Sequence, residues 1–324
     1  MEHAIRLHRT GGPEVLQYEE VAVGEPGPGE VRIRHAAVGL NFADTYFRNG
    51  LYPAPVPCGL GVEASGVVDA IGTGVTNVAA GDRVTYTGSP LGAYSTARIM
   101  PAASLIRLPA GIACETAAAM TMRGLTAGYL LRSIVPLKSG DTILFHAAAG
   151  GVGLIACQWA RELGLRVIGT VSSEAKAEVA RAHGCDEIIY YGREDVAKRV
   201  RELTDGKGVP VAFDGVGKDT WQSSIDSLGR RGMLVCVGTA SGPFPAIDPM
   251  LLVVRGSLFV TRPALADYIA TPEERATLSQ ELFDHVIAGR IRIEINQHFA
   301  LQDAGHAHRE LESRRTTGSS IFVV

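Results

Sequence analysis

The sequence predicts a two-domain α/β protein in which a β-rich domain is interrupted by a domain built on a parallel sheet. Residues 1–123 are rich in glycine and proline and contain short segments that alternate apolar and polar residues, the pattern of half-buried strands. Between residues 124 and 261, apolar runs alternate with amphipathic helical segments, which indicates βαβ units. Because a mixed pattern returns afterwards, we assign 1–123 and 262–324 to one domain and 124–261 to the other.

In the β-rich domain, the alternation Val31-Arg32-Ile33-Arg34 is typical of a strand with one buried face. The returning segment starts with a helix, because Thr271 can cap it, Pro272 suits its first position and an acid follows in the first turn. Leu278, Leu282 and Val286 then line one helix face. We expect further strands at residues 64–71, 82–86, 291–295 and 321–324, and a final helix from about residue 301.

In the parallel-sheet domain, Ser173 is a plausible N-cap, and Gly164 and Gly184 are suited to end helices. Apolar residues spaced by four and three indicate another helix at 196–203. We expect strands at residues 142–146, 166–171, 209–213, 233–237 and 257–260, and helices at 154–163, 173–183 and 196–203.

The bulk composition excludes several classes of protein. The net charge of −3 and the absence of basic–aromatic stripes argue against nucleic acid as a ligand. The N-terminus has no apolar region typical of a signal peptide, and the longest apolar runs, such as 250–254, are too short to span a membrane. Five scattered cysteines indicate no disulfide framework. We therefore expect a cytoplasmic protein.

The most informative segment is FHAAAGGVG, residues 145–153, between an expected strand and an expected helix. It has the form A-x-G-x-x-G, with Ala148 in place of the usual first glycine of a dinucleotide-binding turn. Gly150 would allow the backbone to approach a pyrophosphate, and Gly153 would allow the helix to pack against the strand. The helix start would attract the phosphates. We predict a Rossmann domain whose pyrophosphate site is formed by Gly150, Gly151, Val152 and Gly153.

The end of the next strand indicates which dinucleotide is bound. NAD sites usually carry an acid there to bind the ribose hydroxyls, whereas this strand ends without one. Ser172, Ser173 and Lys176 follow, and they could bind a 2′-phosphate. Glu174 argues against this interpretation, although an acid at a helix start also suits the helix dipole. We predict NADPH as the cofactor.

Residues 59–68, GLGVEASGVV, resemble the G-H-E-x-x-G-x-V signature of zinc alcohol dehydrogenases. Val62 stands at the position of the liganding histidine, and Asn41 stands where the first cysteine ligand would fall. No C-x-x-C-x-x-C lobe is present in the sequence. Because a catalytic zinc needs three protein ligands with lone pairs, we predict no metal site.

Residues 41–53, NFADTYFRNGLYP, resemble a segment of the zinc-free, zeta-crystallin-like quinone oxidoreductases of the medium-chain dehydrogenase/reductase family. The resemblance extends over essentially the whole chain, through residues 8–16, 80–84, 214–217 and 256–258. It implies a GroES-like fold for the β-rich domain. It also implies that NADPH reduces a quinone by hydride transfer without a metal.

The resemblance implies a set of site residues. Asn41, Tyr46 and Tyr52 would lie beside the nicotinamide and shape the substrate opening. Further cofactor contacts would come from Tyr129, Tyr191, Gly215, Val216, Gly238, Thr239, Phe259 and Val260, and from Arg314 of the β-rich domain. Structural roles remain open for some of these residues, because Tyr52 could pack against Pro53 and Val260 could serve only its strand. We expect Asp214 to fix a turn and His146 to be a hydrogen-bonded core residue.

Two alternative functions remain open. One is a 2-alkenal or enoyl reductase on the same scaffold, because it needs the same hydride geometry. The other is a binding protein regulated by the nucleotide, as zeta-crystallin relatives suggest.

Finally, the apolar runs 250–254 and 257–260 have only Arg255 and Arg262 as nearby charges. An apolar edge strand favours pairing with a second copy, so we predict a homodimer, as the family resemblance also implies.

Overall fold

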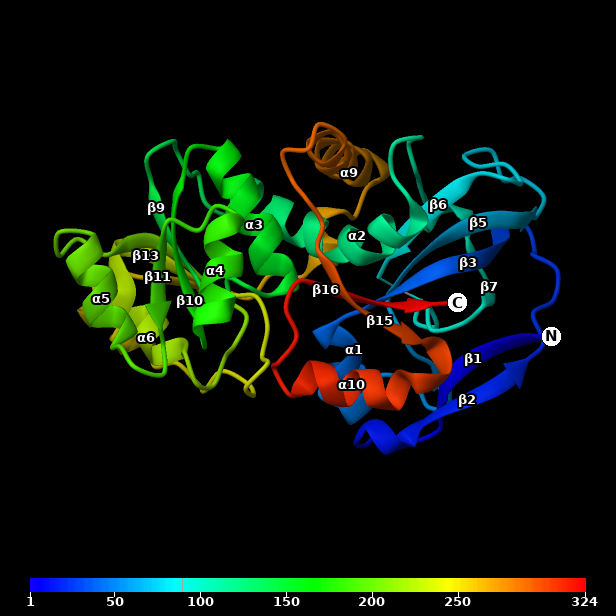
Figure 1. The fold of residues 1–324 in the computed structure, drawn as a ribbon, viewed down its shortest axis with the longest axis horizontal. Coiled ribbons are helices and arrows are strands. Elements are labelled where there is room, and N and C mark those ends of the chain that lie inside the picture. The colour runs from blue at the N-terminus through cyan, green and yellow to red at the C-terminus, as the bar shows by residue number, and fades with distance from the viewer. Residues whose placement is uncertain (89) are drawn as a thin grey trace. The chain divides into compact units, whose positions relative to one another are not determined.

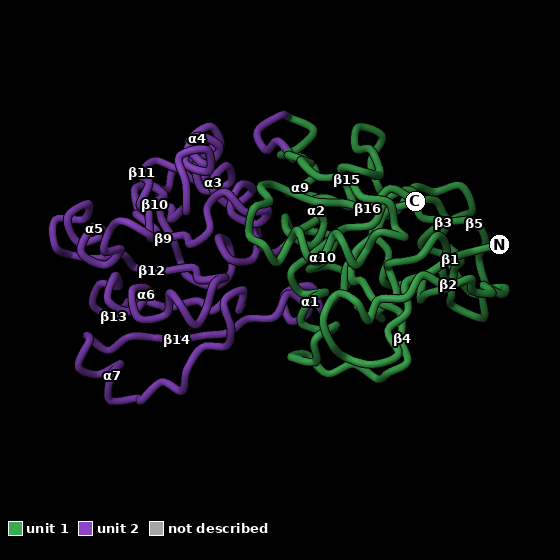
Figure 2. Tube along the Cα trace, turned by 60° about the horizontal axis from the view of Figure 1, so that its bottom comes forward, with its two compact units in different colours: residues 1–125, 271–288, 293–324 green, residues 126–270, 289–292 purple. Residues whose placement is uncertain are grey.

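The computed structural model describes residues 1–88 and 90–324, which form two compact units (Figures 1 and 2). Unit 1 contains residues 1–125, 271–288 and 293–324, and unit 2 contains residues 126–270 and 289–292. Both chain ends therefore belong to unit 1. In the described part of the chain, no helix has the length and apolar character that a membrane crossing requires.

Unit 1 is built on two sheets. The smaller sheet has the order β2-β1-β4, and the larger has the order β15-β16-β3-β5-β6-β8, with β7 paired to β3. The strands are β1 (Glu2–Leu7), β2 (Leu16–Val21), β3 (Glu30–Leu40), β4 (Cys58–Gly59), β5 (Glu63–Ile71), β6 (Arg83–Thr87), β7 (Ala97–Pro101), β8 (Ile106–Arg107), β15 (Ile295–Ala300) and β16 (Ser319–Val323). The strands expected at 31–34, 64–71, 82–86 and 321–324 are thus confirmed.

The helices of unit 1 are α1 (Phe42–Asn49), α9 (Pro272–Ile287) and α10 (Ala304–Glu312), with 3₁₀ turns at Pro13–Val15, Ala102–Ser104 and Leu301–Asp303. The expected start of α9 is confirmed, because the Glu274 amide donates to Thr271 Oγ1 at 3.1 Å and the Thr271 amide donates to the Glu274 carboxylate at 3.0 Å. Helix α10 contributes buried residues to the main core of the unit, which it shares with strand residues such as Ile33 and Phe322.

Unit 2 is a Rossmann-type layer of parallel strands, in the order β11-β10-β9-β12-β13-β14. The strands are β9 (Thr142–Phe145), β10 (Arg166–Val171), β11 (Glu187–Tyr190), β12 (Val209–Asp214), β13 (Leu228–Cys236) and β14 (Phe259–Thr261). The helices are α3 (Gly151–Glu162), α4 (Glu174–Ala182), α5 (Val196–Leu203), α6 (Trp221–Ser227), α7 (Pro249–Val254) and α8 (Leu265–Tyr268). Helix α2 (Cys114–Tyr129), which begins in unit 1 and ends in unit 2, and a π-helical turn (Leu130–Ile134) precede them.

The local signals in unit 2 are confirmed. Ser173 caps α4, since its hydroxyl oxygen accepts the Lys176 amide at 3.4 Å. Gly184 follows α4 with φ of +91°, a conformation that favours glycine. One face of the sheet is covered by α5 and α6, whose Val196, Val200 and Ile225 join strand residues in a buried cluster.

Three expectations about the elements need correction. Residues 291–294 do not form a strand, and β15 begins only at Ile295. The reason is that the Arg292 main chain bonds to the side-chain amide of Gln158, at 2.8 and 3.0 Å, instead of to a neighbouring strand. The last strand of unit 2 starts two residues later than expected, because Ser257 adopts φ of +57°. Strand β13 starts at Leu228 instead of 233.

The division of the chain also differs from the expected boundary at residue 261. Residues 262–270 belong to unit 2, and helix α8 lies in this segment. The ring of Tyr268 stacks on that of Tyr129, with centroids 4.4 Å apart and planes 13° from parallel. This aromatic contact ties the segment to the start of unit 2.

Candidate active site

The predicted cofactor residues of unit 2 gather at the carboxyl edge of the parallel sheet. In a doubly wound sheet, ligands bind outside this edge. Most of the predicted residues lie in the loop after a strand or at the start of the next helix: Gly150, Gly151, Val152 and Gly153 after β9, Ser172 and Ser173 after β10, Tyr191 after β11, Gly215 and Val216 after β12, and Gly238 and Thr239 after β13. The topology therefore brings five loops from distant parts of the sequence to one edge.

The loop after β9 has the geometry of a phosphate-binding turn. Ala147 adopts φ of +54°, and Gly150 caps helix α3 without a side chain. A Cβ atom on Gly153 would lie 2.5 Å from the Ala147 carbonyl oxygen, so only glycine allows this close approach of helix and strand. The first amides of a helix have no intrahelical acceptor, and the first turn of α3 carries no acid. The turn therefore suits an anion.

The corner after β10 carries hydroxyl groups and a lysine. The Ser173 oxygen accepts the Lys176 amide, so its O–H can still donate to an outside acceptor. The acid at this corner, Glu174, is engaged elsewhere: it accepts the Tyr190 hydroxyl at 2.7 Å and lies 3.6 Å from the Arg181 guanidinium. This arrangement weakens the argument that Glu174 serves a ribose.

The loops after β12 and β13 are bonded to each other. The Ala240 amide donates to the Gly215 carbonyl at 3.2 Å, and the Ser241 amide donates to the Val216 carbonyl at 2.8 Å. Asp214 fixes the first turn, as expected, because it accepts the Val216 and Gly217 amides at 2.8 and 3.0 Å. A Cβ atom on Gly215 would meet no protein atom within 4 Å. The glycine therefore leaves open space at the edge where a dinucleotide would lie.

The remaining predicted residues of unit 2 occupy varied environments. Tyr129 is buried and stacked on Tyr268, whereas Tyr191 is 47% exposed. Phe259 and Val260 lie within the edge strand β14, and the Phe259 side chain is 55% exposed. Val260 packs against the buried cluster of the sheet. Val260 therefore has a packing role in its strand, which is the structural role that the sequence left open.

In unit 1, helix α1 positions the three predicted catalytic residues. Asn41 precedes the helix, and its amide N–H donates to Asp44 at 2.8 Å. Tyr46 is buried, and the Tyr52 amide donates to its carbonyl at 2.9 Å. The two tyrosine rings meet edge to face, with centroids 5.2 Å apart. Arg314 lies just after α10, with φ of +59°.

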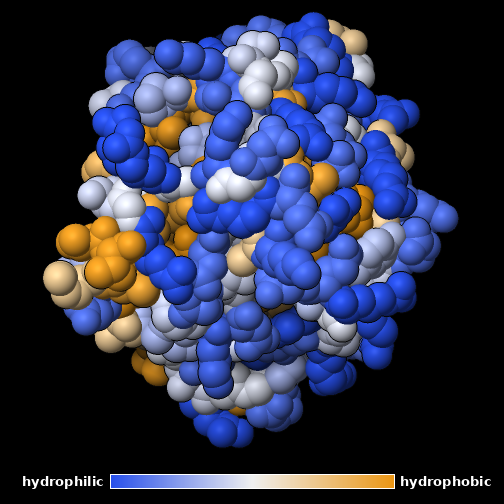
Figure 3. Space-filling model, turned by 90° about the vertical axis from the view of Figure 1, so that its left-hand side faces the viewer, coloured by the Kyte–Doolittle hydropathy of each residue, from blue (hydrophilic) through white to orange (hydrophobic). Residues whose placement is uncertain are grey.

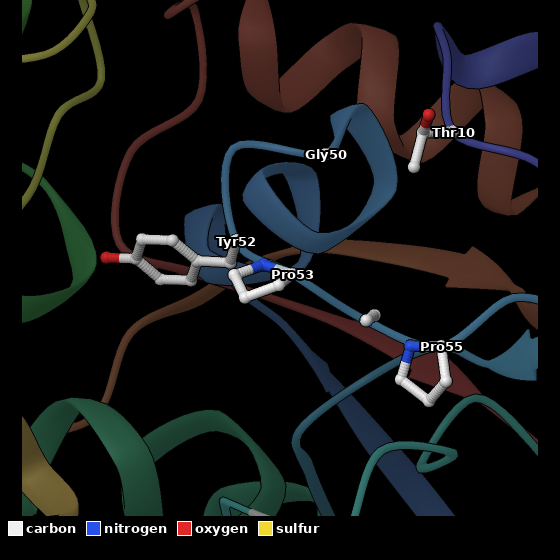
Figure 4. A pocket seen from close by; sticks show the side chains of 6 residues that line it. Thr10, Gly50, Tyr52, Pro53 and Pro55 are labelled. Atoms are coloured by element: carbon white, nitrogen blue, oxygen red, sulfur yellow. The ribbon is translucent and has the colours of Figure 1, made fainter.

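Tyr52 also borders an open hollow of about 520 Å³ (Figure 4). The other lining residues are Thr10, Gly50, Pro53, Ala54 and Pro55. The Tyr52 hydroxyl points away from Thr10 and Pro55. The ring therefore forms one side of the hollow, while its polar group faces elsewhere.

A buried ion pair between Glu63 and Arg123, next to Asn41, was not predicted from the sequence. Glu63 is fully buried, and its carboxylate accepts the Asn41 side-chain amide at 2.8 Å and the Met122 main-chain amide at 2.6 Å. Arg123 lies 3.6 Å from the same carboxylate. Burial raises the pKa of Glu63, and the nearby Arg123 charge opposes this shift. Glu63 stands in the GLGVEASGVV motif, but nothing in the sequence identified Arg123 as its partner.

A second polar cluster adjoins this pair and includes Asp44 and Arg48 of α1. The Tyr94 hydroxyl donates to Asp44 at 2.8 Å and lies 3.1 Å from His308 Nε2. Arg48 donates to His308 Nδ1 at 2.9 Å and forms a paired contact with Glu312. Burial raises the pKa of Asp44 to about 7 and lowers the pKa of His308 to about 3. This cluster also was not predicted, because its members are widely separated in the sequence.

The residues at the former metal positions do not fit a zinc ion. Val62 offers no lone pair, and the Asn41 amide is bonded to Glu63. Within residues 1–88 and 90–324, no three His, Cys, Asp or Glu side chains come together as a metal-binding group.

Comparison with known proteins identifies the relatives of this chain. Residues 27–110 match the model of the alcohol dehydrogenase GroES-like domain, and residues 151–275 match the model named zinc-binding dehydrogenase. A quinone oxidoreductase of Pseudomonas aeruginosa is 54% identical over the full length of both chains. A 2-haloacrylate reductase of a Burkholderia species is 46% identical over 100% of this chain and 99% of its own. The crystal structure of the Escherichia coli quinone oxidoreductase complexed with NADPH superimposes with a TM-score of 0.98 at 47% identity, covering 99% of this chain and 100% of that one.

Proposed function

The chain belongs to the quinone oxidoreductase family of the medium-chain dehydrogenases/reductases, and we propose that it is an NADPH-dependent enzyme that reduces quinones. The full-length identity of 54% to a quinone oxidoreductase carries this proposal. The carboxyl edge of the sheet in unit 2 supports it, because the phosphate turn and the open space at Gly215 suit a dinucleotide.

The protein's contribution is to bind and orient. When bound, NADPH supplies the hydride from its nicotinamide ring. Gly150–Gly153 would hold the pyrophosphate, Gly215, Val216, Gly238 and Thr239 the nicotinamide half, and Tyr129, Tyr191 and Arg314 the remaining parts. Asn41, Tyr46 and Tyr52 would position the quinone. A quinone needs little acid catalysis, because its reduced oxyanion is aromatic and stable.

A panel of acceptors tests this function. With NADPH as the donor, kcat/KM should be higher for small quinones than for 2-alkenals or 2-haloacrylates. A higher value for an activated alkene would replace the proposed function with the alkene reductase alternative. Tight NADPH binding without turnover of any acceptor would favour a nucleotide-regulated binding protein.

We propose that Ser172, Ser173 and Lys176 select NADPH over NADH. Lys176→Ala should raise KM for NADPH by about 5- to 150-fold, the equivalent of roughly 1–3 kcal/mol for a lost charge-assisted hydrogen bond, and should change KM for NADH little. Lys198→Ala is a matched control, because Lys198 follows the N-cap of α5 at the same spacing. Steady-state kinetics with both cofactors provide the measurement, and a wild-type preference for NADH would contradict the proposal.

We further propose that the reaction needs no zinc, although one matching family model is named for zinc binding. Val62 and the Glu63-bound Asn41 support this. Activity should survive prolonged chelation, and elemental analysis should find well under one zinc ion per chain. Stoichiometric zinc together with loss of activity on its removal would refute metal independence.

A homodimer through the edge of the unit 2 sheet is also proposed. Strand β14 is one of the two edge strands, and Met250, Val253, Val254 and Phe259, in β14 and the preceding helix α7, have exposed apolar side chains. Figure 3 shows a group of exposed hydrophobic side chains at the left edge of that view. Val254→Lys should weaken association, because it puts a charge on a side chain that is 71% exposed in the monomer.

Light scattering over a range of concentrations measures this association. Ile287→Lys, at an exposed apolar residue of unit 1, is the control and should leave the mass unchanged. A wild-type mass near 34.3 kDa at micromolar concentration would rule out the dimer.

A cytoplasmic location is likewise a proposal, supported by the odd number of scattered cysteines.

A further inference from the structure

A chain of buried polar side chains runs beneath the carboxyl edge of the unit 2 sheet. It contains Thr170 at the end of β10, His146 after β9, Ser224 in α6 and Asp214 at the end of β12. His146 Nδ1 lies 3.0 Å from Thr170 Oγ1, and its Nε2 lies 2.9 Å from Ser224 Oγ. Ser224 donates to Asp214 Oδ2 at 2.7 Å. Each of the four side chains is at most 1% exposed.

The bonding pattern assigns a direction to every proton in the chain. Asp214 acts as an acceptor, because it also receives two main-chain amides, so the Ser224 hydroxyl proton points toward it. The Ser224 oxygen must then accept from His146 Nε2–H. Burial lowers the pKa of His146, which favours the neutral ring, so Nδ1 accepts the Thr170 hydroxyl. The Thr170 oxygen in turn accepts the Ala147 amide at 3.3 Å.

Both ends of this chain hold loops of the proposed cofactor site. One end is the Ala147 amide, within the phosphate turn that follows β9. The other end is Asp214, which holds the Val216 and Gly217 amides in the loop after β12. Strand β9 lies between β10 and β12 in the sheet, so the chain crosses three neighbouring strands.

Stability alone does not explain a polar chain at this place. Buried polar groups cost free energy unless they are satisfied, and well-packed apolar residues often serve a core equally well. A fully satisfied network, by contrast, fixes one arrangement of the groups that it joins. His146 itself does not act as a catalytic base, because its ring is 1% exposed and both nitrogens are engaged.

We propose that His146 and Ser224 are positioning residues for NADPH, which hold the phosphate turn and the Val216 loop in a single relative arrangement before the cofactor binds. This inference rests on the proposed function, because it assumes that the dinucleotide contacts both loops. Preorganisation of this kind strengthens binding, since the cofactor does not have to order the loops itself.

The test compares two serines of helix α6. Ser224→Ala breaks the chain, whereas Ser227→Ala removes an equally buried hydroxyl that donates only to the Ser223 carbonyl of its own helix. Ser224→Ala should raise the Kd for NADPH, measured by the fluorescence of the cofactor, by about 10-fold, the equivalent of one buried hydrogen bond. KM for NADPH should rise in parallel, and kcat at saturating NADPH should stay near the wild-type value. Ser227→Ala should leave the Kd within about twofold of the wild-type value, even if it lowers the thermal stability as much as Ser224→Ala does.

A double-mutant cycle tests whether the two ends act through His146. Thr170→Val removes the hydroxyl on the other side of the ring, and Thr170→Ser restores it. The effects of Thr170→Val and Ser224→Ala on the Kd should be clearly non-additive, because each already breaks the same chain, and Thr170→Ser should bind NADPH like the wild type.

Two results separate this inference from the function on which it rests. Wild-type protein that does not bind NADPH would overturn the proposed function together with the inference. Wild-type binding, with the same Kd in Ser224→Ala and Ser227→Ala or with additive effects in the cycle, would overturn the inference alone.

Discussion

Arg123→Met should lower the free energy of unfolding by about 3–5 kcal/mol, because it leaves the Glu63 carboxylate buried without its counter-charge. The Arg123 side chain is 8% exposed and that of Glu63 is fully buried. Arg123 also donates to the carbonyls of Leu40 and Ala119, and both acceptors would lose their partner. Guanidinium unfolding of wild type and variant provides the measurement.

The pairing itself is tested by the double variant Glu63→Gln/Arg123→Met. Removing both charges avoids the uncompensated ion, so the double variant should be more stable than Arg123→Met alone. Arg199→Met is the control, because its ion pair with Glu202 is exposed and should contribute less than about 1 kcal/mol. Equal losses in Arg123→Met and Arg199→Met would show that the buried pair does not stabilise unit 1.

The same variant bears on the candidate site, because Glu63 holds the side chain of Asn41. The side-chain amide of Asn41 donates to Oε2 of Glu63, the same carboxylate oxygen that faces Arg123. Loss of the guanidinium would favour protonation of Glu63, whose pKa burial already raises. Asn41, at the start of α1, would then lose a charge-assisted bond that sets its orientation.

Features governed by neighbouring residues could be predicted from the sequence. The caps at Ser173 and Thr271 depend on side chains within three residues, and both form as expected. The glycine turn after β9 and the order of strand and helix around it are equally local. The role of Asp214 in its turn and the core position of His146 were also inferred correctly.

Features governed by distant partners could not be predicted. The isoleucines at 291, 293 and 295 alternate like a strand, but Gln158, far earlier in the chain, takes the Arg292 main chain out of the ladder. Arg123 lies 60 positions from Glu63 in number, and His308 is 214 residues from Tyr94. No periodicity links such residues, so buried networks emerge only once the fold brings their elements together.

Asp44→Asn should change the pH dependence of stability, because burial raises the pKa of this carboxyl from 3.8 to about 7. The main-chain amide of Asn41 and the hydroxyl of Tyr94 both donate to Asp44. The charges of Glu63 and Arg123 also face it, and their effects on its pKa act in opposite directions. Asp44 Oδ1 is buried and has no hydrogen-bond partner. An asparagine can keep its oxygen toward Asn41 and Tyr94 and place its NH₂ group at that second position.

The sign of the effect follows from proton linkage. Between pH 4 and pH 7 the folded protein keeps the Asp44 proton, whereas the unfolded chain releases it. The stability that this group contributes is therefore complete below the unfolded pKa and is lost as the pH rises toward the folded pKa. The asparagine variant has no such proton, so it should gain on the wild type by about 3 kcal/mol between pH 5 and pH 8.

Guanidinium unfolding of both proteins at several pH values measures this difference. Comparing variant with wild type should cancel the contributions of His35 and His308, whose pKa values burial lowers. Asp205→Asn, at an exposed carboxyl that already adopts φ of +50°, is the control and should run parallel to the wild type. A constant difference between Asp44→Asn and wild type from pH 5 to pH 8 would mean that Asp44 is charged throughout, held so by the amide of Asn41, Tyr94 and the field of Arg123.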